Sequence, residues 1–85
     1  MSNCYFIYVL YNDDFDRYYI GMSHNVESRL MDHNKGLSKS TKPYVTWTLV
    51  HKEQFETRME ARTREKYLKS AAGRRWRKKN INLGD

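Results

Sequence analysis

Apolar positions in the first part of the chain fall into two runs that predict paired strands. Residues 4–11 are apolar or aromatic at every position, which is typical of a central strand covered on both faces. Residues 12–16 are rich in asparagine and aspartate, and residues 17–21 are again largely aromatic or apolar. Two such runs around a turn-forming segment predict a β-hairpin. Gly21 is expected to end its second strand.

The polar pattern after the hairpin predicts a first helix. Asn25 is suited to cap a helix over residues 26–35, because its side chain can accept a hydrogen bond from a backbone N–H of the first turn. Glu27 would lie in that first turn, where the helix dipole favours a carboxylate. Gly36 is expected to end the helix.

A loop and a third strand are predicted next. Residues 37–42 are polar and precede Pro43, the single proline, so we expect them to form an exposed loop. Apolar and polar residues then alternate over residues 44–51, which is the pattern of a β-strand.

The last part of the chain predicts helix. Thr57 followed by Glu60 matches a capping box, and a helix is expected from there to about Ala71. Gly73 is expected to break that helix. The basic segment Arg74–Lys79 would add one or two further helical turns.

The order strand, strand, helix, strand, helix predicts one α+β domain spanning residues 1–85. Its sheet would have three mostly antiparallel strands flanked by helices. A chain of 85 residues buries a small core, and an aromatic content of 14% increases the area that each buried side chain removes from water.

Composition narrows the class of protein. The single cysteine, Cys4, cannot form an internal disulfide or a cysteine-type zinc site. The chain has no signal-peptide pattern and no apolar run of the roughly 20 residues that a membrane helix needs. We therefore expect a soluble, cytoplasmic protein without membrane association.

The positive charge is concentrated towards the C-terminus. Residues 1–57 carry 6 lysines and arginines against 7 acidic residues, whereas residues 58–85 carry 10 against 3. A basic segment of this kind indicates a polyanion partner such as nucleic acid. A solvated basic helix face would produce the same count, so charge alone identifies no chemistry.

Glu65 is the candidate with the most unusual position. On the helical period it shares a face with Ala61, Leu68 and Ala72, the apolar stripe of the predicted helix. A carboxylate on a core-facing stripe is unfavourable unless it is paired or binds a metal. Two interpretations remain open, a buried ion pair with an arginine and a ligand of Mg²⁺, which commonly uses one or two carboxylates with water and phosphate.

Arg29 and His33 are a second candidate pair. Their i, i+4 spacing places them on one side of the first helix. The planar guanidinium could clamp a phosphate. A surface arginine beside a histidine bonded to the backbone is the structural alternative, and the spacing does not distinguish the two. Five tyrosines also crowd the hairpin, and most of them are expected to be core rings.

Several ordered motifs together resemble the GIY-YIG endonuclease domain. The motifs are Phe6-Ile7-Tyr8, Tyr19-Ile20-Gly21, the helix segment Arg29–Asn34, the basic loop Lys39–Lys42, the strand Trp47–Val50 and its exit Glu53–Phe55, and the helix carrying Ala61, Glu65, Lys66, Lys69 and Ser70. The likeness covers nearly the whole chain, in the manner of short bacterial members that consist of little else.

The resemblance implies hydrolysis of DNA phosphodiester bonds with one divalent metal, Mg²⁺ or Mn²⁺. By position, Tyr8 would be the general base or relay for the attacking water, and Tyr19 would orient the water or the phosphate. Arg29 would stabilise charge on the scissile phosphate, and His33 would assist proton transfer or positioning. Glu65 would hold the metal, which neutralises the leaving 3′ oxygen.

The sequence departs from the family pattern in two places. Phe6 stands where the first motif has glycine, which matters little in an extended backbone if Tyr8 keeps its direction. Asn80 is the nearest candidate for a late asparagine of the family, although it lies farther from Glu65 than expected. The chain also lacks the DNA-recognition module appended in many relatives. We therefore expect low sequence specificity, with DNA structure or a protein partner setting the target, for example in DNA repair.

Two other functions remain alternatives. The first is a nucleic-acid-binding module on the same scaffold with little catalysis, in which an aromatic ring stacks on a base while cations meet phosphates. The second is a tyrosine-linked strand transferase, which would leave a covalent protein–DNA adduct. The candidate nucleic-acid contacts are Lys39, Lys42, Arg74, Arg75, Trp76 and Lys78.

Overall fold

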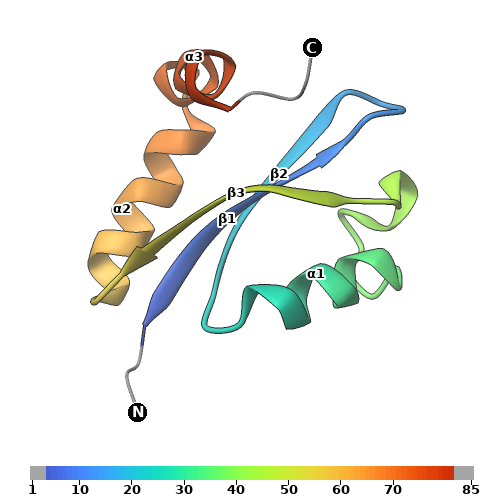
Figure 1. Ribbon diagram of the computed structural model, residues 1–85, viewed down its shortest axis with the longest axis horizontal. Helices are drawn as coiled ribbons and strands as arrows, with labels where there is room; N and C mark the ends of the chain where they lie inside the picture. Colours follow the sequence, from blue (N-terminus) through green and yellow to red (C-terminus); the bar gives the residue numbers. More distant parts are fainter. Residues whose placement is uncertain (1–3, 82–85) are drawn as a thin grey trace.

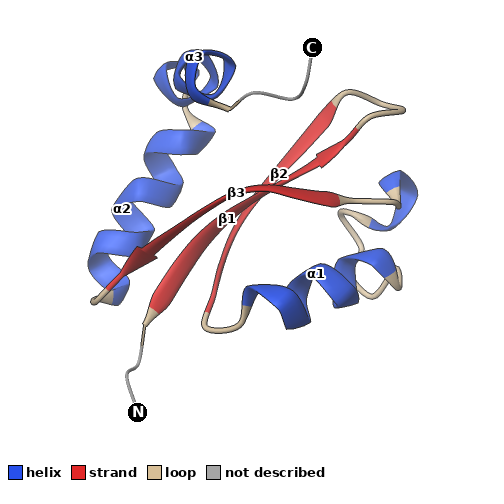
Figure 2. Ribbon diagram, viewed as in Figure 1, coloured by secondary structure: helices blue, strands red, loops and turns tan. Residues whose placement is uncertain are grey.

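The computed structural model describes residues 4–81 as a three-stranded antiparallel sheet with helices on both sides (Figure 1, Figure 2). The strand order is β2-β1-β3, so the first strand is central. The elements are β1 (Tyr5–Asn12), β2 (Arg17–Ser23), α1 (Val26–Asn34), the 3₁₀ turn η1 (Lys42–Tyr44), β3 (Thr48–Phe55), α2 (Arg58–Lys69) and α3 (Ala71–Asn80). The predicted α+β class is confirmed.

The central strand β1 is buried on both faces, as its unbroken apolar pattern predicts. Ile7 and Val9 point to one face, where they pack with residues of α2. Tyr8 and Leu10 point to the other face, where they pack with Val26 of α1. Helices α1 and α2 therefore cover opposite faces of the sheet (Figure 1).

The predicted hairpin is confirmed, with one correction at its end. Strand β2 continues to Ser23, so Gly21 lies inside the strand and does not end it. In the antiparallel register Gly21 is paired with Tyr8. The strand continues because its backbone pairs with β1 beyond the glycine, and a pattern of side chains does not report on that pairing.

Helix α1 forms where it was predicted. The side chain of Asn25 accepts a hydrogen bond from the backbone N–H of Ser28, 3.0 Å away. The helix ends at Asn34, and Gly36 follows with a positive φ of 76°.

The predicted third strand is wrong by four residues, because β3 covers residues 48–55. The segment before it is held by two asparagine side chains. Asn12 donates from Nδ2 to the backbone oxygens of Tyr44 and Thr46. Asn34 accepts from the backbone N–H of Trp47 at 2.6 Å and donates to its carbonyl oxygen at 3.0 Å. These side chains take the place of a strand partner, and in this loop Trp47 is buried whereas Val45 is exposed.

The prediction for the C-terminal helices is correct at its start and wrong at the break between the helices. The capping box of Thr57 and Glu60 is confirmed. However, the break falls at Ser70, whose side chain accepts from the backbone N–H of Gly73 and caps α3. A Cβ at Gly73 would lie 2.2 Å from the carbonyl oxygen of Tyr67, so this glycine allows α3 to turn closely against α2. Gly73 is thus part of α3 and does not end α2.

Across residues 4–81, none of the helices has both the length and the apolar character needed to cross a membrane.

Candidate active site

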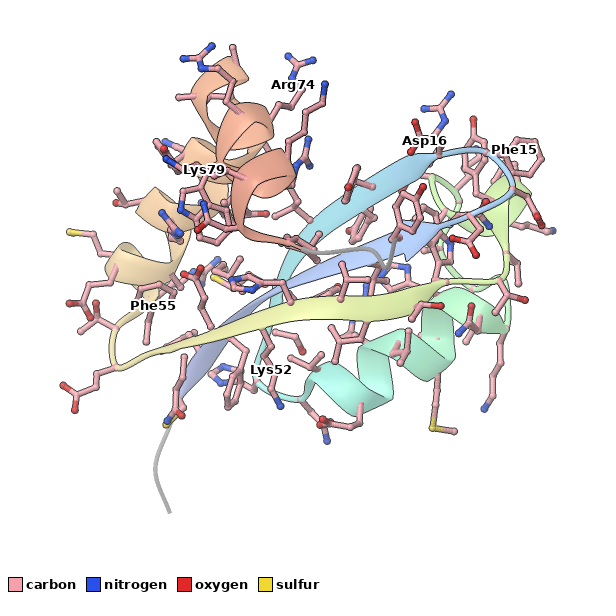
Figure 3. All side chains as sticks on the ribbon, turned by 45° about the horizontal axis from the view of Figure 1, so that its top comes forward. Phe15, Asp16, Lys52, Phe55, Arg74 and Lys79 are labelled. Atoms are coloured by element: carbon pink, nitrogen blue, oxygen red, sulfur yellow. The ribbon has the colours of Figure 1, made fainter. Side chains whose placement is uncertain are left out.

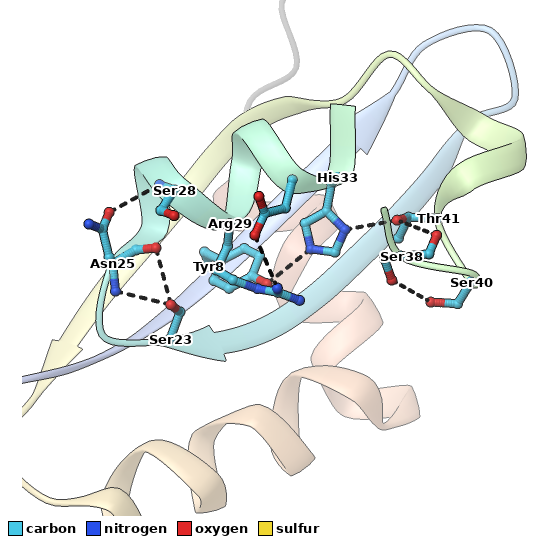
Figure 4. A network of polar contacts seen from close by, with 10 residues as sticks. Tyr8, Ser23, Asn25, Ser28, Arg29, His33, Ser38, Ser40 and Thr41 are labelled. Carbon is cyan, nitrogen blue, oxygen red and sulfur yellow. Dashed lines mark hydrogen bonds and ion pairs between the residues drawn. The ribbon is translucent and has the colours of Figure 1, made fainter. Parts of the chain in front are cut away.

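Tyr8 and His33 meet in the buried layer between the sheet and α1. Tyr8 comes from the central strand, and His33 comes from the last turn of α1. The two side chains are 1% and 0% exposed, and the Tyr8 hydroxyl oxygen lies 3.1 Å from Nε2 of His33 (Figure 4). A buried hydroxyl and a buried imidazole each need a polar partner, and here each supplies the other.

A third side chain determines which nitrogen of His33 carries the proton. Thr41 is buried, and its hydroxyl oxygen lies 2.8 Å from Nδ1 of His33 (Figure 4). The Thr41 hydroxyl donates its own hydrogen to the carbonyl oxygen of Ser38, 3.4 Å away. With that hydrogen directed at Ser38, Thr41 accepts from Nδ1–H, and we assign the proton of the neutral imidazole to Nδ1. It follows that Nε2 accepts a hydrogen bond from Tyr8.

Arg29 and Tyr19 complete the cluster. Figure 4 shows the Arg29 guanidinium beside Tyr8, and its Nη1 lies 3.4 Å from an oxygen of Asp32. The Arg29 side chain is 42% exposed, so its charge is available to a ligand from solvent. The Tyr19 ring packs between its neighbours, with centroids 4.6 Å from His33 and 6.2 Å from Tyr8.

Burial and Arg29 set the protonation states in this cluster. Burial raises the pKa of Tyr8 above its ordinary value, and the hydrogen bond from Arg29 offsets only part of that rise. Burial also lowers the pKa of His33, and the nearby positive charge of Arg29 lowers it further, although Asp32 acts against both. Both groups are therefore neutral near pH 7. Tyr8 needs a base to accept its proton, and the unprotonated Nε2 of His33 is in place to do so.

The structure places Glu65 apart from the contacts that join the other four candidates. Glu65 lies on α2, on the other face of the sheet, and its side chain is 15% exposed. Of the two interpretations left open, the ion pair with an arginine is wrong, since an oxygen of Glu65 lies 3.1 Å from Nζ of Lys69, one turn along the helix. Within residues 4–81, Lys69 is the polar partner that the structure gives to Glu65.

A groove lies at the edge of the sheet formed by β2, next to α2 and α3. It encloses about 350 Å³ between β2, α2 and α3. Tyr19 lines this groove together with Lys69, the partner of Glu65. The full lining is Tyr18, Tyr19, Ile20, Lys69, Arg74 and Arg77.

The donor set allows a weakly coordinated divalent cation. No group of three or more histidine, cysteine, aspartate or glutamate side chains is arranged to hold a metal in the part of the chain that the structure describes. A single half-buried carboxylate such as Glu65 suits Mg²⁺, which keeps most of its waters and takes further oxygens from a phosphate. The chemistry of Glu65 therefore fits the predicted ion, whereas it would not fit zinc.

The predicted nucleic-acid contacts occupy different environments. Lys39 and Lys42 are exposed in the loop after α1. Arg74, Arg75 and Lys78 are exposed on α3. Trp76 is half-buried, and its ring packs against the core with the Arg64 guanidinium 4.6 Å from its centroid. The Trp76 ring is thus already occupied by contacts within the protein. Base stacking by Trp76 stays a prediction.

Several residues that contact the candidate site residues or line the groove were not predicted from the sequence. His51, which has no predicted role, lies 2.7 Å from Glu53, and Glu53 is bonded twice by Arg64, at 2.9 and 3.0 Å. This network joins β3 to α2. Thr41 was missed as the partner of His33, and Arg77 was missed as a lining residue of the groove. For Thr41, the position in a polar loop eight residues after His33 was a weak signal. For Arg77, nothing in the basic segment distinguishes it from its neighbours.

The chain belongs to the GIY-YIG family, because the family model described as the GIY-YIG catalytic domain matches residues 4–80. No curated protein and no solved structure matches the chain. GIY-YIG domains are generally endonucleases, and membership implies a nuclease-type function with DNA as substrate.

Proposed function

We propose that this GIY-YIG chain hydrolyses phosphodiester bonds of DNA with the help of one divalent cation, Mg²⁺ or Mn²⁺. The observation that carries the proposal is the buried hydrogen-bonded series Tyr8–His33–Thr41, which lies beside the half-exposed guanidinium of Arg29. A binding module has no need of a tyrosine hydroxyl aimed at an unprotonated imidazole nitrogen. A hydrolase needs such a pair to remove a proton from water.

In this proposal Tyr8 acts as a relay for the proton of the attacking water. The Tyr8 oxygen takes the water proton while the Tyr8 hydrogen passes to Nε2 of His33, 3.1 Å away. The relay avoids a free phenolate, which the raised pKa of Tyr8 disfavours. Thr41 continues to accept from Nδ1–H and holds the imidazole ring in the orientation that receives the proton.

Arg29 and Tyr19 act on the phosphate side. A guanidinium stabilises the negative charge that a phosphate gains as the water oxygen attacks. Arg29 is suited to this because its side chain reaches solvent while the hydrogen bond to Tyr8 ties it to the relay. Tyr19 borders both the relay and the groove, so it would orient the water or the phosphate between them.

Glu65 is the residue that would hold the divalent cation. A cation bound there would supply Lewis-acid stabilisation of the leaving 3′ oxygen. The Lys69 ammonium now paired with Glu65 is 53% exposed, so it can move away into solvent when a cation arrives. Such an exposed ion pair contributes little to stability, roughly 0–1 kcal/mol.

Low sequence specificity is part of the same proposal. The exposed cations on the loop and on α3 are suited to phosphates, which carry no sequence information directly. The target would then be set by DNA structure or by a protein partner, as expected for an enzyme of DNA repair acting in the cytoplasm.

A cleavage assay tests the proposal. Linear, nicked, branched and single-stranded DNA are offered to the protein with Mg²⁺, with Mn²⁺ or with a chelator. Strand scission is expected with either metal and is expected to stop with the chelator. Binding without scission on every substrate would favour the alternative, a nucleic-acid-binding module. A protein–DNA adduct that survives denaturation would favour a strand transferase.

A further inference from the structure

The groove between β2, α2 and α3 has a strongly basic lining. Three of its six lining residues are cationic, namely Lys69, Arg74 and Arg77, and none is acidic. Lys69 is paired with Glu65. Within residues 4–81 the structure gives no ion pair to Arg74 or Arg77. The groove therefore concentrates positive charge, and within residues 4–81 no acidic side chain neutralises its two arginines.

Arg77 is the most informative residue of the groove. It is 8% exposed, which is unusual for an arginine, and its guanidinium lies 4.4 Å from the centroid of the Tyr18 ring. Its Nε is buried and has no hydrogen-bond partner among the described residues. Buried polar donors are nearly always satisfied, so an unpartnered one in a groove wall indicates a missing acceptor.

The two arginines also act on each other. Arg74 lies one helical turn before Arg77 on α3, and its positive charge adds to the burial that lowers the pKa of Arg77. An anion in the groove would relieve this repulsion and would accept hydrogen bonds from the guanidinium groups. Phosphate oxygens match the planar fork of an arginine in both charge and geometry.

The groove lies next to the relay. Tyr19 lines it and also packs its ring 4.6 Å from that of His33. A strand whose scissile phosphate is at Arg29 could therefore place another of its phosphates against α3. The exposed arginine Arg75 is adjacent in sequence to Arg74 but does not line the groove; it lines a separate cavity with Trp76. In Figure 3, Arg74 extends from the side of α3 nearer Asp16, and Lys79 from the other side.

We propose that Arg74 and Arg77, with Lys69, form a second phosphate site that holds the backbone of the DNA substrate beside the cleavage site. The inference rests on the proposed function, because the phosphate belongs to the DNA that the relay would cleave. The site recognises a phosphodiester and no base, so it positions the strand without selecting a sequence.

A matched pair of variants tests the site by DNA binding. Affinity for a short duplex is measured against salt concentration in the presence of a chelator, which excludes cleavage. Arg74→Ala is expected to lower the affinity about tenfold and to reduce the slope of log K against log salt by about 0.9, the value for one lost phosphate contact. Arg62→Ala removes the same charge from an exposed position on α2 outside the groove, and less than about a twofold change is expected. Equal effects of the two variants would overturn the proposal.

A titration with inorganic phosphate locates the site independently. Backbone amide signals of residues 18–20 and 74–77 are expected to shift in the unaltered protein, and to shift less in Arg77→Lys, which keeps the charge but loses the fork. Shifts confined to other residues would exclude the groove. If Arg77→Lys does not fold, the comparison of Arg74→Ala with Arg62→Ala still decides the question.

The outcome is separable from that of the nuclease proposal. Metal-dependent cleavage with equal binding by Arg74→Ala and Arg62→Ala would leave the nuclease and remove the second site. Selective loss of binding in Arg74→Ala without cleavage by the unaltered protein would remove the nuclease and leave a phosphate site. Lys69 is not used as a variant, because it is bonded to the proposed metal ligand.

Discussion

Gly21 lies directly across the sheet from Tyr8, and a Cβ at Gly21 would stand 2.5 Å from the Tyr8 hydroxyl oxygen. The same Cβ would stand 3.0 Å from the Tyr19 ring. The last residue of the Tyr19-Ile20-Gly21 motif is therefore a glycine for a steric reason. It leaves the space that is occupied by the end of the Tyr8 ring and by the hydroxyl group that contacts His33.

Gly21→Ala tests this steric role. The added methyl group must displace the Tyr8 ring, because the contact is far shorter than van der Waals distance. We expect a loss of stability of about 1–3 kcal/mol from overpacking, measured by urea unfolding. Cleavage is expected to fall about a hundredfold, the effect of moving a reacting group by about 1 Å. An Ala variant with full activity would show that the position of Tyr8 does not matter for cleavage.

Tyr8→Phe removes the first group of the relay while the ring stays in place. The rate of cleavage is expected to fall by about 10²–10⁴, the usual contribution of a general base. The variant should remain folded, with a loss of about 1–3 kcal/mol because Nε2 of His33 is left buried without a partner. Tyr11→Phe is the matched control, since it removes a hydroxyl from the same strand that is bonded to Asp16 and not to His33. Comparable activity of the two variants would argue against the relay.

Thr41→Val tests the positioning of His33. Valine has a similar shape but cannot accept from Nδ1–H, so the imidazole loses the contact that assigns its proton to Nδ1. We expect the cleavage rate to fall about tenfold, the equivalent of one hydrogen bond, and its pH profile to change. Thr41→Ser should restore both, because it keeps the hydroxyl. A Val variant with an unaltered rate and pH profile would remove Thr41 from the mechanism.

The pH dependence follows from the lowered pKa of His33. His33 accepts the relayed proton only when it is neutral, so cleavage is expected to rise with pH below about 6.5 and to level off near neutrality. The free energy of unfolding is also expected to increase as the pH is raised through this range. Below about pH 6.5 the unfolded chain takes up a proton at this position while the buried imidazole stays neutral, so stability falls until the pH drops through the folded-state pKa.

Two measurements check this prediction. Single-turnover cleavage is followed between pH 5 and 8, and urea unfolding is followed over the same range. His33→Gln is the reference for both, because it cannot titrate. A cleavage rate that increases as the pH is lowered would contradict a neutral His33 in the mechanism.

Glu65→Gln separates metal binding from DNA binding. Cleavage is expected to fall at least about a hundredfold, because the amide is a poor ligand for Mg²⁺. DNA affinity in the presence of a chelator should be unchanged or slightly higher, since a negative charge is removed near Lys69. Glu56→Gln is the control, as it makes the same change of charge at an exposed position outside the proposed site. Full activity of Glu65→Gln would remove the metal assignment.

Elements whose determinants are local were predicted correctly from the sequence. The Asn25 cap and the capping box of Thr57 and Glu60 act within four residues, so their side chains define where α1 and α2 begin. The prediction of β3 failed because its position depends on two distant asparagines, Asn12 and Asn34, which hold the segment before it. The alternation of apolar and polar residues shows which side chains can be buried, but it does not show with which other segment the backbone will form hydrogen bonds.

The sequence by itself determined the fold class and the family, since these follow from short motifs and local periodicity, and its resemblance to the family supplied Tyr8 and His33 as candidates for the proposed relay. Only the tertiary structure decided which groups meet. It joined Tyr8 and His33, which are 25 residues apart, added Thr41 to them, and placed Glu65 on the other face of the sheet with Lys69 as its partner. It also distinguished Arg77 from the other cations of α3. The physical reason is that hydrogen bonds and burial depend on the distance between residues in space. The spacing of residues along the chain determines that distance only within one helical turn or one pair of adjacent strands.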